Sequence, residues 1–192
     1  MDKGKFKQHV EGLLPEKRFQ HTLRVAETAK RLAVTYGSDP EKAEIAALLH
    51  DLAKYFDLEK MKDSVTAHSE IPKDLLHFHP ELWHAPVGAA YARENLEVLD
   101  QDILNAITYH TTGRAEMSLL EKIIFLADYI EPGRHFPGVE EVRELAKTDL
   151  DKAIAKALKN TIDFLLSRSQ LIYPETIHAY NAFIPKLGGH VE

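Results

Sequence analysis

Two adjacent residues, His50 and Asp51, carry the clearest potential for chemistry in this sequence. They follow an apolar run from Ile45 to Leu49. Burying an imidazole and a carboxylate there costs several kcal/mol unless something compensates them. One divalent cation compensates both, because it binds a neutral imidazole nitrogen and a carboxylate oxygen together. Taken alone, the pair is also compatible with a helix end that carries a solvated acid and a hydrogen-bonded histidine.

Other ionisable residues lie on apolar helix faces or at predicted helix ends, as this pair does. They are His21, His84, His110 and Asp128. A set of histidines and carboxylates without sulfur favours iron, manganese, cobalt or zinc, whereas calcium and magnesium prefer more oxygen ligands. Individually, His21 could be a buried hydrogen-bonded imidazole and Asp128 a carboxylate that reaches solvent. Together, the six residues predict a metal site.

Composition is that of a folded globular protein. The chain has 192 residues, of which 44% are hydrophobic and 28% charged, enough for one domain with a sizeable core. A formal net charge of −6 gives no reason to expect a nucleic-acid partner, which would need a basic face. The absence of cysteine excludes disulfides and thiolate sites, and no apolar run predicts a signal sequence or a membrane span. We therefore expect a cytoplasmic protein with no membrane partner, and leave a homodimer open.

Helical periodicity runs through nearly the whole chain, and no stretch alternates as a strand would. We expect helices over residues 6–14, 15–36, 40–51, 58–68, 85–91, 103–110, 119–130, 139–146, 150–169 and 174–184. Asp39, Asp57 and Asp100 are predicted N-caps, and Ser118 with Glu121 forms a predicted capping box. Residues 68–84 form a loop with short helical turns, which leaves His84 just outside the next helix, and residues 188–190 form a frayed end. This pattern predicts an all-α, single compact domain over 1–192, with a metal-site core of about 16–135 and C-terminal helices of about 139–186.

The order of these residues resembles the HD superfamily of metal-dependent phosphohydrolases, which are all-helical enzymes named for the His-Asp pair. Longer stretches resemble the bacterial symmetrical diadenosine tetraphosphate hydrolases of that superfamily. These stretches are 20–25, 49–54, 83–89, 109–113 and 125–134, with a fainter match at 172–176. The resemblance implies a metal held by His21, His50, Asp51 and Asp128, with one ion favoured and iron the usual cation. It also implies a dinucleoside polyphosphate substrate, which a metal-activated water cuts symmetrically to give two ADP.

Several further residues are candidates for contact with the phosphate chain. Lys54, expected one helical turn after His50, can offer a point charge, and Arg134 can bind phosphate oxygens in a fork. Thr111 and Phe136 are further substrate-contact candidates, the latter for adenine. Asp51 can also orient the attacking water, or bridge two ions if a second one is present.

His84 and His110 have two alternative roles. They can hold phosphate oxygens and protonate the leaving phosphate, or they can bind a second metal with Asp51. Phosphate contact is favoured, because His84 precedes a predicted helix N-terminus and His110 adjoins Thr111.

Two rival functions remain at this stage. One is another HD phosphohydrolase that acts on nucleotides, deoxynucleotides or cyclic dinucleotides. The other is a metal-containing sensor that binds a nucleotide, such as a nucleoside diphosphate, with little turnover.

Overall fold

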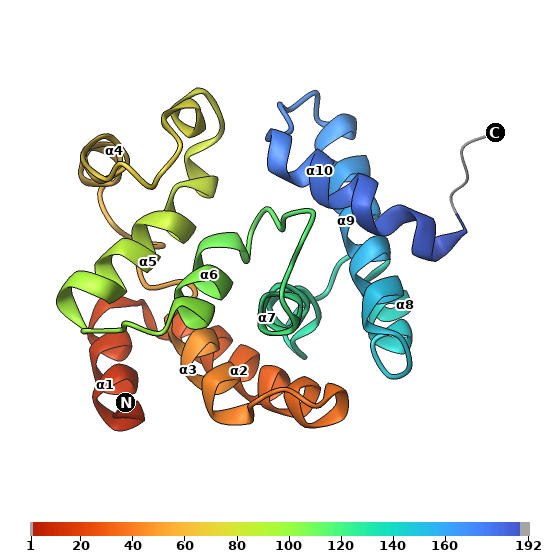
Figure 1. Ribbon diagram of the computed structural model, residues 1–192, viewed down its shortest axis with the longest axis horizontal. Helices are drawn as coiled ribbons and strands as arrows, with labels where there is room; N and C mark the ends of the chain where they lie inside the picture. Colours follow the sequence, from red (N-terminus) through yellow and green to blue (C-terminus); the bar gives the residue numbers. More distant parts are fainter. Residues whose placement is uncertain (1, 189–192) are drawn as a thin grey trace.

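The computed structural model describes residues 2–188, and helices are the only regular secondary structure in that range (Figure 1). The expected frayed end lies mostly outside it, since residues 189–192 are not described. The α-helices are α1 (Lys3–Leu13), α2 (Glu16–Tyr36), α3 (Pro40–Leu49), α4 (Leu58–Ala67), α5 (His84–Asn95), α6 (Gln101–Tyr109), α7 (Leu119–Ile130), α8 (Val139–Leu145), α9 (Leu150–Ser167) and α10 (Pro174–Phe183). Three short 3-10 helices are η1 (Lys73–His77), η2 (Pro80–Leu82) and η3 (Ile184–Leu187). The all-α prediction is confirmed.

Several helices begin where the sequence predicts. The side chains of Asp39, Asp57 and Asp100 each accept hydrogen bonds from two backbone amides in the first turn of α3, α4 and α6. Gly37 ends α2 in the left-handed conformation, with φ of 74°, as a C-terminal glycine does. The expected helical turns in residues 68–84 are η1 and η2.

Around the His-Asp pair the expected helix is too long. α3 ends at Leu49, and the chain continues in tight turns, with the amides of Leu52 and Lys54 bonded to carbonyls three residues earlier. The prediction that Lys54 follows His50 by one turn of the same helix is therefore wrong. His84 is the first residue of α5 rather than a residue outside it.

The capping box at the start of α7 is only half formed. Ser118 Oγ accepts from the amide of Glu121 at 3.2 Å, as predicted. The Glu121 carboxylate instead accepts two hydrogen bonds from Arg114, at 2.7 and 2.6 Å. A charge-assisted pair with a guanidinium is stronger than a bond to one backbone amide, so the arginine takes this side chain away from the cap.

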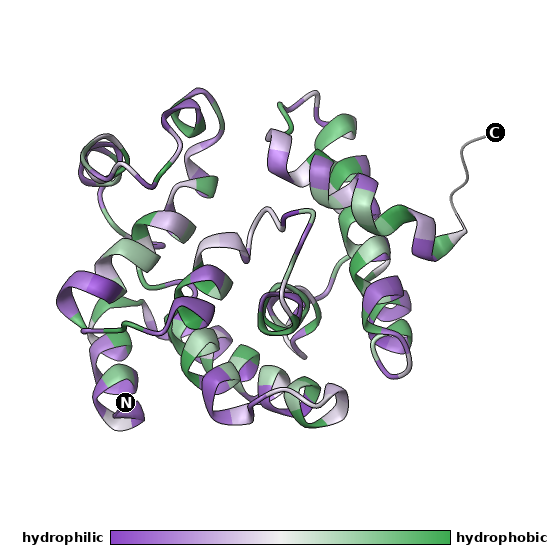
Figure 2. Ribbon diagram, viewed as in Figure 1, coloured by the Kyte–Doolittle hydropathy of each residue, from purple (hydrophilic) through white to green (hydrophobic). Residues whose placement is uncertain are grey.

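α7 runs through the middle of the molecule and is seen end-on in Figure 1, with α2, α6 and α9 around it. Several helices, such as α6 and α9, carry a hydrophobic and a hydrophilic side (Figure 2). Fully buried alanines at positions 43, 46 and 47 let α3 pack closely on its neighbours. One hydrophobic core runs from Phe6 in α1 to Phe183 in α10, so the C-terminal helices share their core with the helices that carry the predicted site. Within residues 2–188, no helix is long and apolar enough to cross a membrane.

Candidate metal centre

Six ionisable side chains from five places in the chain meet between α2, α3, α5, α6 and α7. They are His21 in α2, His50 and Asp51 after α3, His84 at the start of α5, His110 after α6 and Asp128 near the end of α7. All except Asp128 are buried, and the side chain of Asp128 is 18% exposed. The structure therefore brings together all the residues that the sequence identifies as metal-type ligands.

Asp51 lies at the centre of this cluster. Its Oδ2 is 3.0 Å from His50 Nε2 and 3.6 Å from His21 Nε2. Its Oδ1 is 3.1 Å from His84 Nε2 and 3.9 Å from His110 Nε2. One carboxylate thus faces two pairs of histidines, one pair with each oxygen.

Asp128 is a second carboxylate near the first pair, His21 and His50. Its Oδ1 lies 3.0 Å from His21 Nε2 and 3.8 Å from His50 Nε2. Three overlapping groups have potential ligand atoms within 4.8 Å of one another: His21-His50-Asp51, His50-His110-Asp128 and Asp51-His84-His110. The first group is part of the predicted one-ion site, and the third matches the alternative second site.

Buried polar atoms without hydrogen-bond partners indicate what this cluster needs. Nε2 of His21, Nε2 of His50 and both oxygens of Asp51 are buried and make no hydrogen bond among the described residues. Leaving such atoms without a hydrogen bond is costly, whereas a cation can bind both Nε2 atoms and a carboxylate oxygen at once. A divalent metal therefore fits the residues present.

Three of the cluster histidines are oriented by their own backbone. The Nδ1 atoms of His50, His84 and His110 lie 2.6, 2.6 and 2.7 Å from the carbonyl oxygens three residues earlier. A carbonyl only accepts, so each Nδ1 is the donor, and a neutral ring then presents the Nε2 lone pair to the centre. His21 instead bonds through Nδ1 to the carboxylate of Glu131, at 3.0 Å.

Electrostatics keep both carboxylates ionised and one of the histidines neutral. Burial raises the pKa of Asp51, but His50 and His84 outweigh it and hold this pKa well below the usual value. For Asp128, His21 and Arg134 outweigh burial in the same way and lower the pKa. Burial lowers the pKa of His110 well below its usual value, so its imidazole is neutral near neutral pH.

Positively charged side chains contact the cluster or lie near it. Arg134 donates from Nη2 to Asp128 Oδ1 at 2.5 Å and from Nε to the Asp128 carbonyl at 3.0 Å. Arg18, in α2, forms an ion pair with Asp51 Oδ2. Lys54 is paired with Glu81 at 2.5 Å. Lys54 and His84 also line one cavity of about 360 Å³, which is within the size range of small-molecule sites.

The remaining predicted contact residues differ in position. Thr111 follows His110 directly, and its buried hydroxyl has no hydrogen-bond partner among the described residues. Phe136 is 37% exposed and packs edge-on against Tyr129, with ring centroids 5.0 Å apart. Thr111 therefore retains an unused polar atom, whereas Phe136 is partly engaged by a neighbouring ring.

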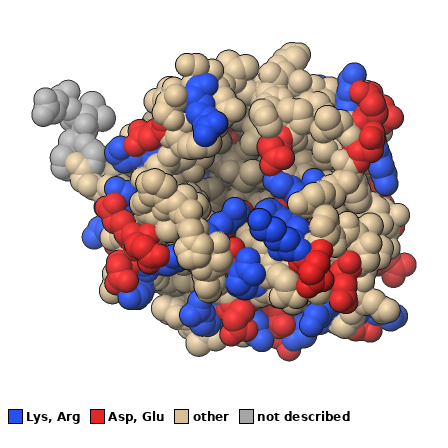
Figure 3. Space-filling view, turned by 180° about the vertical axis from the view of Figure 1, so that it is seen from behind, with Lys and Arg blue, Asp and Glu red and all other residues tan. Residues whose placement is uncertain are grey.

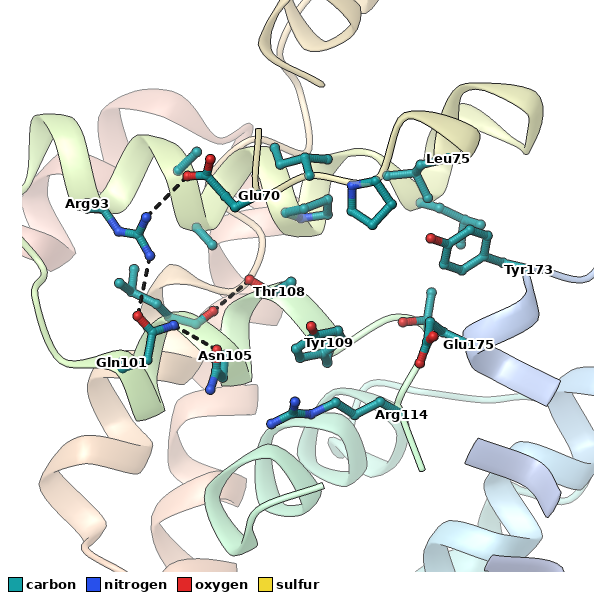
Figure 4. Close-up of a pocket in the computed structure, with 18 residues that line it drawn as sticks. Glu70, Leu75, Arg93, Gln101, Asn105, Thr108, Tyr109, Arg114, Tyr173 and Glu175 are labelled. Carbon is teal, nitrogen blue, oxygen red and sulfur yellow. Dashed lines mark hydrogen bonds and ion pairs between the residues drawn. The ribbon is translucent and has the colours of Figure 1, made fainter. Parts of the chain in front are cut away.

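A second cavity, of about 350 Å³, lies on the outer side of α5 and α6 (Figure 4). Ala89, Arg93, Leu104 and Thr108 line it at helical spacing, and none of the six cluster residues does. At one end Arg93 is bonded to Glu70 and Gln101, while at the other Tyr109, Arg114, Tyr173 and Glu175 lie near one another (Figure 4). The two helices thus present one side to the metal-type cluster and another to this cavity.

Sequence reasoning missed two charged partners of the cluster, Arg18 and Glu131. Both leave a signal in helical spacing, because Arg18 is three residues before His21 and Glu131 is three residues after Asp128. Each therefore lies on about the same side of its helix as a predicted ligand.

Known proteins resemble this chain along nearly its whole length. The family model described as HD domain matches residues 18–133. The chain is 53% identical to the symmetrical bis(5'-nucleosyl)-tetraphosphatase of Halalkalibacterium halodurans, over 96% of this chain and 98% of that protein. It is 51% identical to the Bacillus subtilis protein of the same name, over 90% of this chain and 92% of that protein. A Clostridium acetobutylicum crystal structure, described as a predicted HD superfamily hydrolase involved in NAD metabolism, has a TM-score of 0.91 and 42% identity, covering 97% of this chain and 98% of that one.

Proposed function

The chain belongs to the HD-domain family and, within it, to the symmetrical bis(5'-nucleosyl)-tetraphosphatases, and we propose that it hydrolyses diadenosine tetraphosphate symmetrically to two ADP. Related dinucleoside polyphosphates belong to the same substrate class. The observation that carries the proposal is the buried His-Asp cluster, with its unpaired Nε2 and carboxylate atoms, in a chain with these relatives.

HD-family membership implies a divalent metal, and iron is the cation we propose, bound by His21, His50, Asp51 and Asp128. When bound, such a cation lowers the pKa of its water and polarises a phosphoryl oxygen. Asp51 has a second role in this proposal. Its Oδ1 points away from His21 and His50 toward His84, where it can accept a hydrogen bond from the attacking water and orient it.

Binding a polyphosphate requires local positive charge in a chain whose net charge is −6. Lys and Arg side chains gather beside a hollow on the face opposite to the view of Figure 1 (Figure 3). We assign Arg134 and Lys54 to the phosphate chain, and add Arg18 because it lies at Asp51. Thr111 can donate its unpartnered hydroxyl to a phosphate oxygen, and Phe136 remains the candidate for adenine contact.

His84 and His110 are assigned to the leaving phosphate rather than to a second ion. Their Nε2 atoms are 3.1 Å apart, so they can share a proton or both hydrogen-bond to one phosphate oxygen that lies beside them. Because burial lowers the pKa of His110, its protonated form would readily give a proton to the leaving phosphate. The second-ion alternative uses the same atoms together with Asp51.

Product analysis tests the proposal directly. Purified protein is incubated with diadenosine tetraphosphate and iron, manganese or cobalt, and the products are separated by chromatography. Two ADP per substrate is the expected result. AMP with ATP would mean asymmetric cleavage, and no turnover with any of the three metals would remove the enzymatic proposal.

The two rival functions make different predictions in the same assay. Another HD phosphohydrolase would leave the dinucleotide intact and hydrolyse deoxynucleotides or a cyclic dinucleotide. A sensor would bind ADP with little turnover and would retain that binding in an Asp51→Ala variant. The proposed hydrolase, in contrast, loses metal binding and turnover together in the Asp51→Ala variant.

A further inference from the structure

Glu131 is a buried carboxylate at the end of α7 that has no role in the proposed hydrolysis. Its residue exposure is 1%, and it lies 110 positions from His21 in sequence. His21 Nδ1 is 3.0 Å from Glu131 Oε1. An ionised carboxylate only accepts hydrogen bonds, so this contact requires the proton on Nδ1 and leaves Nε2 available toward Asp51 and Asp128.

The carboxylate is itself held by two further groups. Arg24, one turn after His21 on α2, donates from Nε at 2.6 Å and from Nη2 at 3.3 Å. The backbone amide of Gly133 donates to Oε2 at 2.6 Å. A Cβ at position 133 would come within 2.5 Å of the Arg24 guanidinium, so the arginine packs directly on this glycine.

Glu131 also begins the turn that leads to Arg134. The Arg134 amide bonds to the Glu131 carbonyl at 2.9 Å, while the Arg134 guanidinium reaches back to Asp128. Arg143 fastens the same turn by donating to the carbonyls of Glu131 and Arg134, at 2.7 and 2.8 Å. The Glu131 side chain therefore contacts both a predicted metal ligand and the backbone that carries a predicted phosphate ligand.

We infer that Glu131 is the positioning residue of this site: it fixes His21 as an Nε2 ligand and sets the turn that aims Arg134 at the substrate. This inference rests on the proposed function for the roles of His21 and Arg134. Hydrogen-bond partners of metal-bound histidines are typically worth a 10- to 100-fold change in metal affinity. A neutral amide at this position lacks the charge, and one of its two terminal atoms cannot accept.

The chain offers a matched control for Glu131→Gln. Glu121 lies on the same helix, is also 1% exposed, and accepts two hydrogen bonds from one arginine, Arg114. It contacts no cluster histidine in the described structure. Glu131→Gln and Glu121→Gln therefore each break one buried Glu–Arg pair, but only the first removes a partner of His21.

Manganese binding to the two metal-free variants, measured by chelator competition, provides the first readout. We expect Glu131→Gln to weaken binding about 10- to 100-fold and Glu121→Gln to leave it within about twofold of wild type. Equal losses in both variants would make Glu131 a merely structural residue and overturn the inference.

A second readout does not depend on any variant folding. Nitrogen-15 NMR of metal-free wild type reports which His21 nitrogen carries the proton. We expect a proton on Nδ1, and a ring protonated on Nε2 alone would overturn the inference even if Glu131→Gln cannot be purified.

The effect on Arg134 is tested by ADP binding in a double-mutant cycle. We expect Glu131→Gln to weaken ADP binding when Arg134 is present. In the Arg134→Ala background the same substitution should weaken ADP binding little further, because both substitutions act on one contact. Full additivity would remove the Arg134 part of the inference. All these readouts are independent of turnover, so absence of dinucleotide hydrolysis would defeat the proposed function and leave this inference standing.

Discussion

His21 and the other three histidines of the cluster all present their Nε2 atoms to Asp51, but they are held differently. His50, His84 and His110 are each oriented by a carbonyl three residues earlier. His21 is oriented by a carboxylate that lies 110 residues away in sequence. The three local histidines keep their geometry as long as their own turn is folded, whereas His21 is correctly placed only when α2 and α7 pack together. The cluster therefore joins a local half, made of His50, His84 and His110, to a long-range half, made of His21 and its partner Glu131, which depends on tertiary structure.

The largest expected effect comes from Asp51, which contacts both halves. Asp51→Ala should reduce metal affinity by more than the roughly 100-fold upper value for an outer hydrogen-bond partner, because it removes a proposed ligand itself. Turnover should fall to background with it. Metal analysis and a product assay check this, with Asp57→Ala, an exposed helix cap, as the control that should retain metal. Full metal occupancy in Asp51→Ala would contradict the assignment.

Variants of His84 and His110 test whether these two histidines of the local half bind phosphate or a second ion. We expect His84→Gln and His110→Gln to lower turnover by about 10²- to 10⁴-fold, the usual contribution of a positioned acid or base. The metal content of each variant should stay at the wild-type value. A fall from two ions per chain to one would show instead that these histidines hold a second metal.

Acid pH should weaken the long-range half through Glu131. Burial raises the pKa of this side chain, but hydrogen bonds from Arg24, His21 and Gly133 outweigh it and lower the pKa from 4.5 to about 2. The ionised form therefore stabilises the folded state above pH 4.5, and this stabilisation is lost as the pH falls toward 2. Urea unfolding of metal-free wild type and Glu131→Gln should give stabilities that converge as the pH falls from about 6 to about 3. A difference independent of pH would contradict the pKa shift.

The smallest effect is expected from Gly133→Ala, which disturbs only the support of Arg24. A methyl group there meets the guanidinium at 2.5 to 2.8 Å, so the arginine must move. We expect a loss of about 1 kcal/mol in the free energy of unfolding, typical of a small overpacking. Urea denaturation measures it, with Gly12→Ala as the control, since a Cβ at Gly12 meets nothing within 4 Å. Metal affinity should fall less than in Glu131→Gln.

What could be predicted from the sequence follows the same division between local and long-range contacts. The caps Asp39, Asp57 and Asp100 bond to amides two or three residues away, so their types and spacing were sufficient. The six cluster residues were identifiable because ionisable groups at the ends of apolar helices require compensation. For Glu131, the spacing from Asp128 indicates the side of the chain on which it lies, but nothing in that spacing indicates that its partner is on α2.

Competition between hydrogen-bond and ion-pair partners explains two predictions of local structure that were wrong. Glu121 has the spacing of a capping box, but Arg114, seven residues earlier, offers two charge-assisted hydrogen bonds instead. The helix before Asp51 was expected to continue, but the chain turns after Leu49 and places both oxygens of Asp51 among the histidines. Each error occurs where a side chain finds its strongest partner outside its own helix.

The separation of His21 from Glu131 also sets an order of events during synthesis. A ribosome adds about 5–20 residues per second, so the 110 residues between them take roughly 5–20 s to appear. During that interval the nascent chain already contains His21, His50 and Asp51, but neither Asp128 nor the carboxylate that orients His21. Assembly of the complete cation site must therefore wait until α7 has left the ribosome, late in the production of the chain.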